Sequence, residues 1–329
     1  LAPFTPTAYA DIEFMEELGD RAVDKDSVVW KVRINGAEPC YALKMFFFHS
    51  ALFLDNTIGS FLTRPLANDR LLIEYFEPFS CEARAYGHLN QEHCEHAAVR
   101  AHGYLLLTPA QERKVAALCA GARGEADPSF FGRSIEPLIA DCPVRAIVKE
   151  LVEGDHVKYF EPRHIGDMAE DLETLHRLGV LVRDIKANNY LGGKLIDLSR
   201  SWTAPHPALD HILEGDLRRQ RRRDPVALHG CIVDWGVDDN WDWSVVKMPE
   251  ELDKCAMGES EHDGWGWDPR RYEWRKWEED LEAAAEFLRE GAFEPEEIEG
   301  EGEEKSEIEG REEDKGEIEA AREEEGGRE

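Results

Sequence analysis

The chain has 329 residues, of which 42% are hydrophobic, including 9 Trp and 14 Phe, and its formal net charge is -31. This apolar content is enough for one two-lobed domain or two small ones. No run of eighteen apolar residues occurs, and seven cysteines without a Cys-x-x-Cys pair favour reduced thiols, so the pattern argues against a membrane protein and a disulfide-stapled secreted one.

The amino-terminal end carries no basic-then-apolar leader, so secretion is not predicted. Its first residue is Leu1 rather than Met, a pattern that fits either a fragment or a gene-model start. Residues 11–19 then lead into 27–34, where alternating apolar and polar side chains predict a strand. Asn35-Gly36 predicts a tight hairpin, because both positions of such a turn need positive φ.

The returning strand, residues 41–46, carries Lys44 between apolar neighbours. A buried ammonium needs an anionic partner, because an unpaired buried charge is costly. Ser80 is a suitable N-cap for a helix over residues 81–91, which places Glu82 in its first turn. Glu82 is therefore the candidate partner, although residues 47–78 lie between the two and are expected to include an insertion.

Two more strands are predicted at 98–108 and 145–152, separated by a Gly- and Pro-punctuated segment, 109–143. A hinge is expected near residues 150–154. The cluster at 93–96, His-Cys-Glu-His, is a metal candidate, but without a second ligand pair it is more often a solvated helix end.

Residues 163–178 keep a helical apolar period, and Gly179 ends that helix. After a short apolar strand, Asp184 opens a loop that leads to Asn189. Gly192-Gly193 then predicts a hairpin, in whose register Asn189 lies beside Asp197. A carboxamide next to a carboxylate can hold Mg²⁺ and nucleotide phosphates, and a second carboxylate can accept a hydroxyl proton. The alternative is that loops simply favour Asp, Asn and Gly.

This stretch resembles the catalytic and metal-binding segments of protein kinases. The family's H-R-D-x-K-x-x-N loop is represented by Arg183, Asp184, Lys186 and Asn189, with Val182 in place of the histidine. The resemblance implies an α+β, bilobal protein-kinase-like fold. A small β-rich lobe with insertions would span 11–150, and a mostly helical lobe would span 151–293.

The same resemblance implies ATP and Mg²⁺ as cofactors and assigns the candidate site residues. Lys44 would hold phosphates and Glu82 would fix Lys44. Asn189 and Asp197 would bind the metal. The catalytic candidates are Asp184, which would orient the acceptor hydroxyl, and Lys186.

Several kinase features are missing. The phosphate-covering G-x-G-x-x-G is reduced to Gly19, followed by an acidic segment with Asp20, Asp24 and Asp26, whose charge opposes phosphate unless it points outward. Asp-Phe-Gly is Asp-Leu-Ser here, and no Ala-Pro-Glu follows. Two functions therefore stay open: an ATP-dependent phosphotransferase acting on protein hydroxyls, or an inactive pseudokinase that serves as an interaction module.

A helix is predicted over 207–223, and its end is a run of five arginines: Arg218, Arg219, Arg221, Arg222 and Arg223. The run would dock an acidic partner, the chain's own tail or nuclear import factors, or it is a solvated helix end favoured by the helix dipole. Residues 232–236 also imitate Asp-Phe-Gly, but the hairpin geometry favours Asp197 over Asp234. The Trp-rich stretch 241–277 predicts lobe packing, followed by a helix over 274–289.

Residues 294–329 hold 18 acidic and 5 basic side chains, so their net charge is -13 and residues 1–293 carry -18. Three decapeptide repeats contribute one isoleucine each, too little apolar surface to order the segment. We expect a disordered acidic tail that confers solubility or binds a basic partner.

Taken together, the motifs from residue 11 to 225 resemble a fungal kinetochore-subunit family with a degenerate kinase-like domain. That resemblance implies protein partners such as kinetochore complex subunits and a nuclear or cytoplasmic location. Apart from the arginine run, no pattern indicates nucleic-acid binding. Activity, substrate and oligomeric state do not follow from these patterns.

Overall fold

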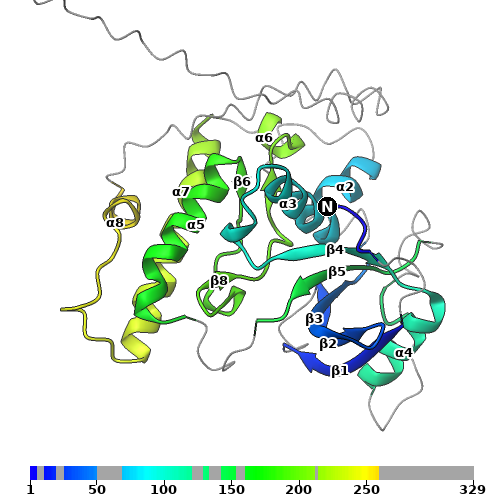
Figure 1. Cartoon of the computed structure of the whole chain (residues 1–329). Coiled ribbons are helices and arrows are strands. Elements are labelled where there is room, and N and C mark those ends of the chain that lie inside the picture. Colours follow the sequence, from blue (N-terminus) through cyan, green and yellow to red (C-terminus); the bar gives the residue numbers. More distant parts are fainter. Residues whose placement is uncertain are drawn as a thin grey trace, which may run out of the picture. The chain divides into compact units, whose positions relative to one another are not determined.

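The computed structural model describes residues 1–5, 11–19, 26–49, 69–120, 129–132, 142–152, 160–211 and 214–258 (Figure 1). The chain divides into two units, Leu1–Glu290 and Gly291–Glu329, and every described residue belongs to the first. The predicted acidic tail, the helix over 274–289, most of the insertion and residues 153–154 of the hinge lie outside the described residues.

Five antiparallel strands form one sheet in the order β1-β2-β3-β5-β4. Their bounds are β1 Ile12–Leu18, β2 Ser27–Ile34, β3 Ala37–Phe46, β4 Ala101–Leu106 and β5 Arg145–Glu150. The predicted hairpin is confirmed, since Asn35 and Gly36 both have positive φ, 54° and 67°. Strand β3 begins four residues earlier than expected, and β4 is shorter than its predicted range.

Helix α4, Pro109–Ala120, fills part of the segment expected to be a loop, and it packs beside the sheet (Figure 1). A capping box starts it: the Gln111 amide donates to Thr108 Oγ1, and Gln111 Oε1 accepts from the Thr108 amide. Proline at the first helical position suits this start. The sequence T-P-A-Q therefore predicts a helix start, although the segment was described by its Gly and Pro residues alone.

Among the described residues, two α-helices precede β4, α2, Asp69–Phe76, and α3, Pro78–Gln91, and the short 3-10 helix η2, Glu95–Ala97, follows them. The prediction that Ser80 caps α3 is wrong, because the N-cap is Glu77 and Pro78 is the first helical residue. Proline is favoured there, since its missing N–H would have no partner in the first turn. Glu77 is buried and forms an ion pair with Arg145 of β5, which ties the start of α3 to the sheet.

The described residues from 160 to 258 are mostly helical, with two small antiparallel strand pairs. Their elements in order are η6 Pro162–His164, α5 Ile165–Arg177, β6 Val180–Leu181, η7 Ala187–Asn189, β7 Tyr190–Leu191, β8 Lys194–Leu195, β9 Trp202–Thr203, α6 Pro207–His211, α7 Glu214–Asp238 and α8 Glu250–Met257. Helix α5 ends as predicted, with Gly179 at φ 72°. Helix α3, the β7–β8 hairpin, α5 and α7 share a second apolar core. The expected α+β, kinase-like order of elements is thus present.

Helix α7 differs most from expectation. It continues past Arg223 to Asp238 with Pro225 inside it, although proline normally interrupts a helix. Asp234 therefore lies within a helix, so residues 232–236 do not form a second metal-binding loop. Trp241, the first residue of the Trp-rich stretch, packs against Phe160, as the lobe-packing prediction expected, and Trp235 of α7 packs there too. Residues 259–277 of that stretch lie outside the described residues. Among the described residues, no helix has the length and apolarity needed to cross a membrane.

Candidate functional site

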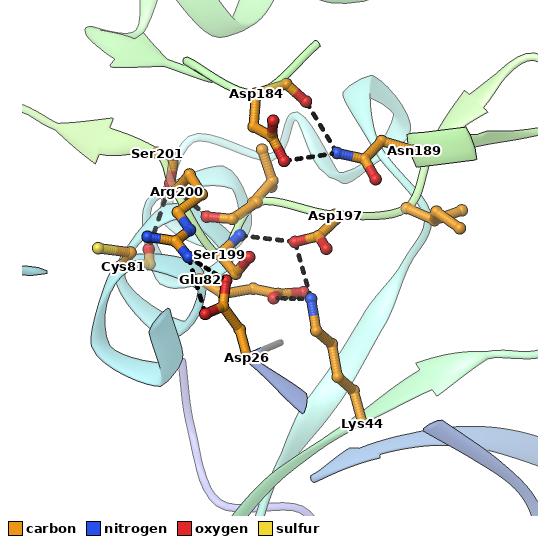
Figure 2. Close-up of polar contacts among 12 residues, drawn as sticks. Asp26, Lys44, Cys81, Glu82, Asp184, Asn189, Asp197, Ser199, Arg200 and Ser201 are labelled. Atoms are coloured by element: carbon orange, nitrogen blue, oxygen red, sulfur yellow. Dashed lines mark hydrogen bonds and ion pairs between the residues drawn. The ribbon is translucent and has the colours of Figure 1, made fainter. Parts of the chain in front are cut away.

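The predicted contact between Lys44 and Glu82 is present. Lys44 Nζ lies 2.7 Å from Glu82 Oε2, and the two side chains are 5% and 0% exposed. Strand β3 supplies the lysine and the first turns of α3 supply the glutamate, so the contact joins sheet and helix across 38 residues of sequence. Figure 2 shows the pair at the lower edge of the site.

Asp197 reaches the same ammonium. Its Oδ1 lies 2.7 Å from Lys44 Nζ and also accepts the backbone N–H of Ser199 at 2.8 Å. The hairpin places it there as predicted, because the Ile196 amide donates to the Asn189 carbonyl at 2.8 Å. Lys44 therefore lies between two carboxylates.

A second buried lysine, Lys149 of β5, was not predicted. Its ammonium forms an ion pair with Glu82 and donates to the Ile196 carbonyl at 2.7 Å. Lys149 pairs with Ala42 in the sheet register, two residues before Lys44, so both lysines point to the same face of neighbouring strands. The sequence does contain a signal for this residue, since Lys149 directly follows the apolar residues A-I-V of the strand.

The four charges of this cluster balance within the protein: Lys44 and Lys149 against Glu82 and Asp197. Burial favours the neutral amine, but the charges of Asp197 and Glu82 outweigh it and raise the pKa of Lys44. Burial likewise opposes ionisation of Asp197, yet Lys44 and Lys149 hold its pKa below the ordinary value. Burial dominates at Lys149, whose pKa is lowered despite the attraction of Glu82.

The other three candidate residues form a second group. Asn189 Nδ2 donates to the Asp184 carbonyl at 2.8 Å and to Asp184 Oδ2 at 3.2 Å. Lys186 Nζ lies 3.0 Å from the same Oδ2, and the Lys186 and Asp184 side chains are about two-fifths exposed, 44% and 39%. In Figure 2, Asp197 lies between this group and Lys44. The six predicted residues thus border one site.

A buried carboxylate on α7 holds the Asp184 loop. Asp224 accepts the backbone N–H groups of Val182 and Arg183 at 2.7 and 2.8 Å, and His176 Nε2 lies 2.9 Å from its Oδ2. Arg183 has φ 68°, a left-handed conformation that is strained for a residue with a side chain. Asp224 stabilises this turn and thereby orients Asp184, which follows it.

We expect Asp224→Asn to destabilise the fold by about 3 kcal/mol, because it removes a buried charge that accepts several hydrogen bonds and turns one oxygen into a donor. Chemical denaturation of the variant measures the loss. Asp238→Asn is the matched control, an exposed position at the end of the same helix, with an expected change within about 0.5 kcal/mol. Equal effects of the two changes would contradict the anchoring role.

The segment after Asp197 is buried against α2 and α3. The Ser201 hydroxyl donates to the Leu198 carbonyl at 2.7 Å, and Trp202 is 1% exposed. The Arg183 guanidinium lies 3.5 Å from the centre of the Trp202 ring, and His206 stacks on that indole. This segment is therefore part of the core at the place where a kinase holds its activation loop.

Asp26 is one of the carboxylates expected to oppose phosphate. Its Oδ2 lies 2.7 Å from Arg200 Nη2, and its Oδ1 lies 3.4 Å from His49 Nε2 (Figure 2). The charge is thus partly compensated within the protein. Asp20 and Asp24 lie outside the described residues.

The oxygen donors suit magnesium only in part. Asn189 and Asp197 supply the carboxamide and carboxylate that Mg²⁺ accepts beside phosphate oxygens. Within the described residues, no three His, Cys, Asp or Glu side chains are grouped to hold a metal, and the 93–96 cluster is no exception. These residues fit a metal ion that a bound nucleotide also coordinates. All seven cysteines are free thiols.

A family model described as kinetochore Sim4 complex subunit FTA2 matches residues 1–202, which contain all six candidate site residues. No curated protein matches the chain. Among solved structures, 156 chains match. One of them, a structure of vaccinia related kinase 3, is 11% identical over 85% of this chain and 88% of that chain, with a TM-score of 0.38. Since the family match spans more than half of its length, the chain belongs to the kinetochore Sim4 complex subunit FTA2 family.

Proposed function

We propose that this chain is a kinase-like interaction module of a kinetochore assembly, located in the nucleus, whose Lys44 site stabilises the fold instead of transferring phosphate. One observation carries the proposal: both buried ammonium groups already have carboxylate partners. Lys44 pairs with Glu82 and Asp197, and Lys149 pairs with Glu82. Phosphate transfer itself requires the Lys44–Glu82 pair, but the Lys44–Asp197 pair and the second lysine, Lys149, go beyond it, so the cluster needs neither phosphate nor metal for charge balance.

Two further features support a role without catalysis. The segment after Asp197 is packed into the core, with Ser201 and Trp202 buried, so it offers little surface to a substrate peptide. Gly19 is the one glycine between β1 and β2, so the close backbone approach that a glycine-rich loop gives to phosphate is not provided. Family membership points to kinetochore proteins as the partners.

A second function has a specific observation in its favour. The Lys44–Glu82 pair and the Asn189–Asp184 hydrogen bonds have the arrangement that ATP-dependent transfer to a protein hydroxyl requires. ATP with Mg²⁺ would supply the transferable phosphoryl group. Lys44 would then hold phosphates and Glu82 would hold Lys44. Asn189 and Asp197 would bind the metal, and Asp184 would orient the hydroxyl with Lys186 beside it.

Thermal unfolding with and without Mg-ATP separates the two functions. A module should show the same Tm in excess Mg-ATP and in EDTA. A nucleotide-binding enzyme gains about 2.7 kcal/mol when the ligand is present at a hundred times its Kd. In parallel, wild type and Asp184→Asn should co-elute equally with the other kinetochore Sim4 complex subunits. A Mg-dependent rise in Tm, or loss of co-elution in the variant, would overturn the proposal.

A further inference from the structure

The arginine run lies in the amino-terminal half of α7 and faces solvent. Arg218, Arg219, Arg222 and Arg223 are exposed, whereas Arg221 is partly buried. Because α7 begins at Glu214 and ends at Asp238, the run starts on its fifth residue. The explanation of a solvated carboxyl-terminal helix end is therefore wrong. The helix dipole favours cations near the other end.

Two of these arginines, Arg222 and Arg223, receive little compensation from the described part of the chain. Arg219 lies three residues before Arg222 and four before Arg223, so their like charges are neighbours on one face and repel. Asp216 pairs with Arg219 at 3.0 Å, and Arg222 reaches only the Cys255 carbonyl at 3.5 Å. Within the part of the chain that the structure describes, no carboxylate forms an ion pair with Arg222 or Arg223. On a chain of net charge -31, Arg222 and Arg223 therefore add repulsion along α7 without an ion pair among the described residues that offsets it.

We infer that this arginine face of α7, Arg218, Arg219, Arg222 and Arg223, docks a short acidic segment of a protein partner. Guanidinium forks match carboxylates in a bidentate geometry. Val226 extends the face by one turn and is 42% exposed, which provides an apolar contact for such a segment.

Charge favours a peptide over nucleic acid as the occupant. Residues 1–293 carry a net charge of -18, which repels a long polyanion such as a DNA duplex. A short peptide places its charges within about one Debye length, ~8 Å at physiological salt, of the arginines and is repelled less by the remaining surface. The inference is independent of whether the Lys44 site transfers phosphate.

Fluorescence anisotropy with the full-length chain and a short fluorescein-labelled polyglutamate peptide tests the inference. The charge reversal Arg219→Glu/Arg222→Glu/Arg223→Glu should weaken peptide binding at least about tenfold. Each exposed arginine–glutamate pair contributes a small binding free energy, three such pairs are lost, and the new glutamates repel the peptide. The control, Arg113→Glu/Arg163→Glu/Arg177→Glu, makes the same charge change at exposed positions on other helices and should lower affinity less than about threefold.

A third variant separates docking from misfolding. Arg219→Lys/Arg222→Lys/Arg223→Lys keeps the charge and the helix, so it should retain most of the binding and should show the wild-type Tm. Failure of the wild-type chain to bind the peptide, or equal losses in the reversal variant and its control, would overturn the inference. Tighter, arginine-dependent binding of a mixed-sequence DNA duplex would overturn the assignment of a peptide.

Discussion

Replacing Glu82 with Gln should destabilise the fold by about 3 to 5 kcal/mol, the usual cost of removing one partner from a buried ion pair. Glu82 is completely buried and forms ion pairs with both lysines of the cluster. After the change, Lys44 keeps its ion pair with Asp197, but Lys149 loses its carboxylate partner and keeps the Ile196 carbonyl and the Tyr86 ring. Chemical denaturation with a fixed buffer and salt measures the loss.

Glu92→Gln is the matched control, because Glu92 is exposed just after the same helix and its change should cost within about 0.5 kcal/mol. The double change Glu82→Gln/Lys149→Met should recover part of the stability, since it removes the lysine that lost its partner. Strictly additive losses would mean that Lys149 does not depend on Glu82, and the description of one shared cluster would be wrong.

The sequence predicted the parts of this site that follow from local rules. A lysine in an apolar strand requires an anion, and the glycine pair fixes the register that brings Asp197 beside Asn189. Lys149 was not predicted, because its ion pair with Glu82 joins residues 67 apart in the sequence and no local rule links the two. The Asp26–Arg200 pair spans 174 residues, and no local rule indicates such a contact.

The errors in the predicted helix ends have the same origin, because they rest on local sequence patterns without the tertiary contacts. The N-cap assigned to Ser80 is Glu77, and the helix expected to end at residue 223 continues through Pro225 to Asp238. The continuation has a tertiary cause. It buries Leu228 and Ile232, which follow Pro225, in the core and keeps the helix intact around Asp224, which accepts two backbone N–H groups of the Asp184 loop. Helix propensity does not include the stability that these tertiary contacts add, so the assembled fold explains why α7 tolerates a proline.

The largest effect is expected at Asp184, if the site transfers phosphate. Asp184→Asn should keep the loop intact, because the amide oxygen can still accept the Asn189 hydrogen bond and the backbone contact to the Asp184 carbonyl is unchanged. It removes the base, so turnover should fall by a factor on the order of 10² to 10⁴ while nucleotide binding persists. Asp197→Asn should instead abolish Mg²⁺-dependent binding, since its carboxylate would be the metal ligand.

Transfer of radiolabelled γ-phosphate to a mixture of kinetochore proteins, with nucleotide binding measured in parallel, distinguishes the outcomes. Asp167→Asn, an exposed aspartate on α5, is the control and should match wild type in both measurements. The proposed interaction module predicts no transfer and no Mg-ATP binding by wild type or any variant, because Lys44 and Asp197 already neutralise each other. Transfer by wild type that disappears in Asp184→Asn but not in Asp167→Asn would contradict the module. It would show that the ion-paired Lys44 releases Asp197 to a metal when a nucleotide arrives.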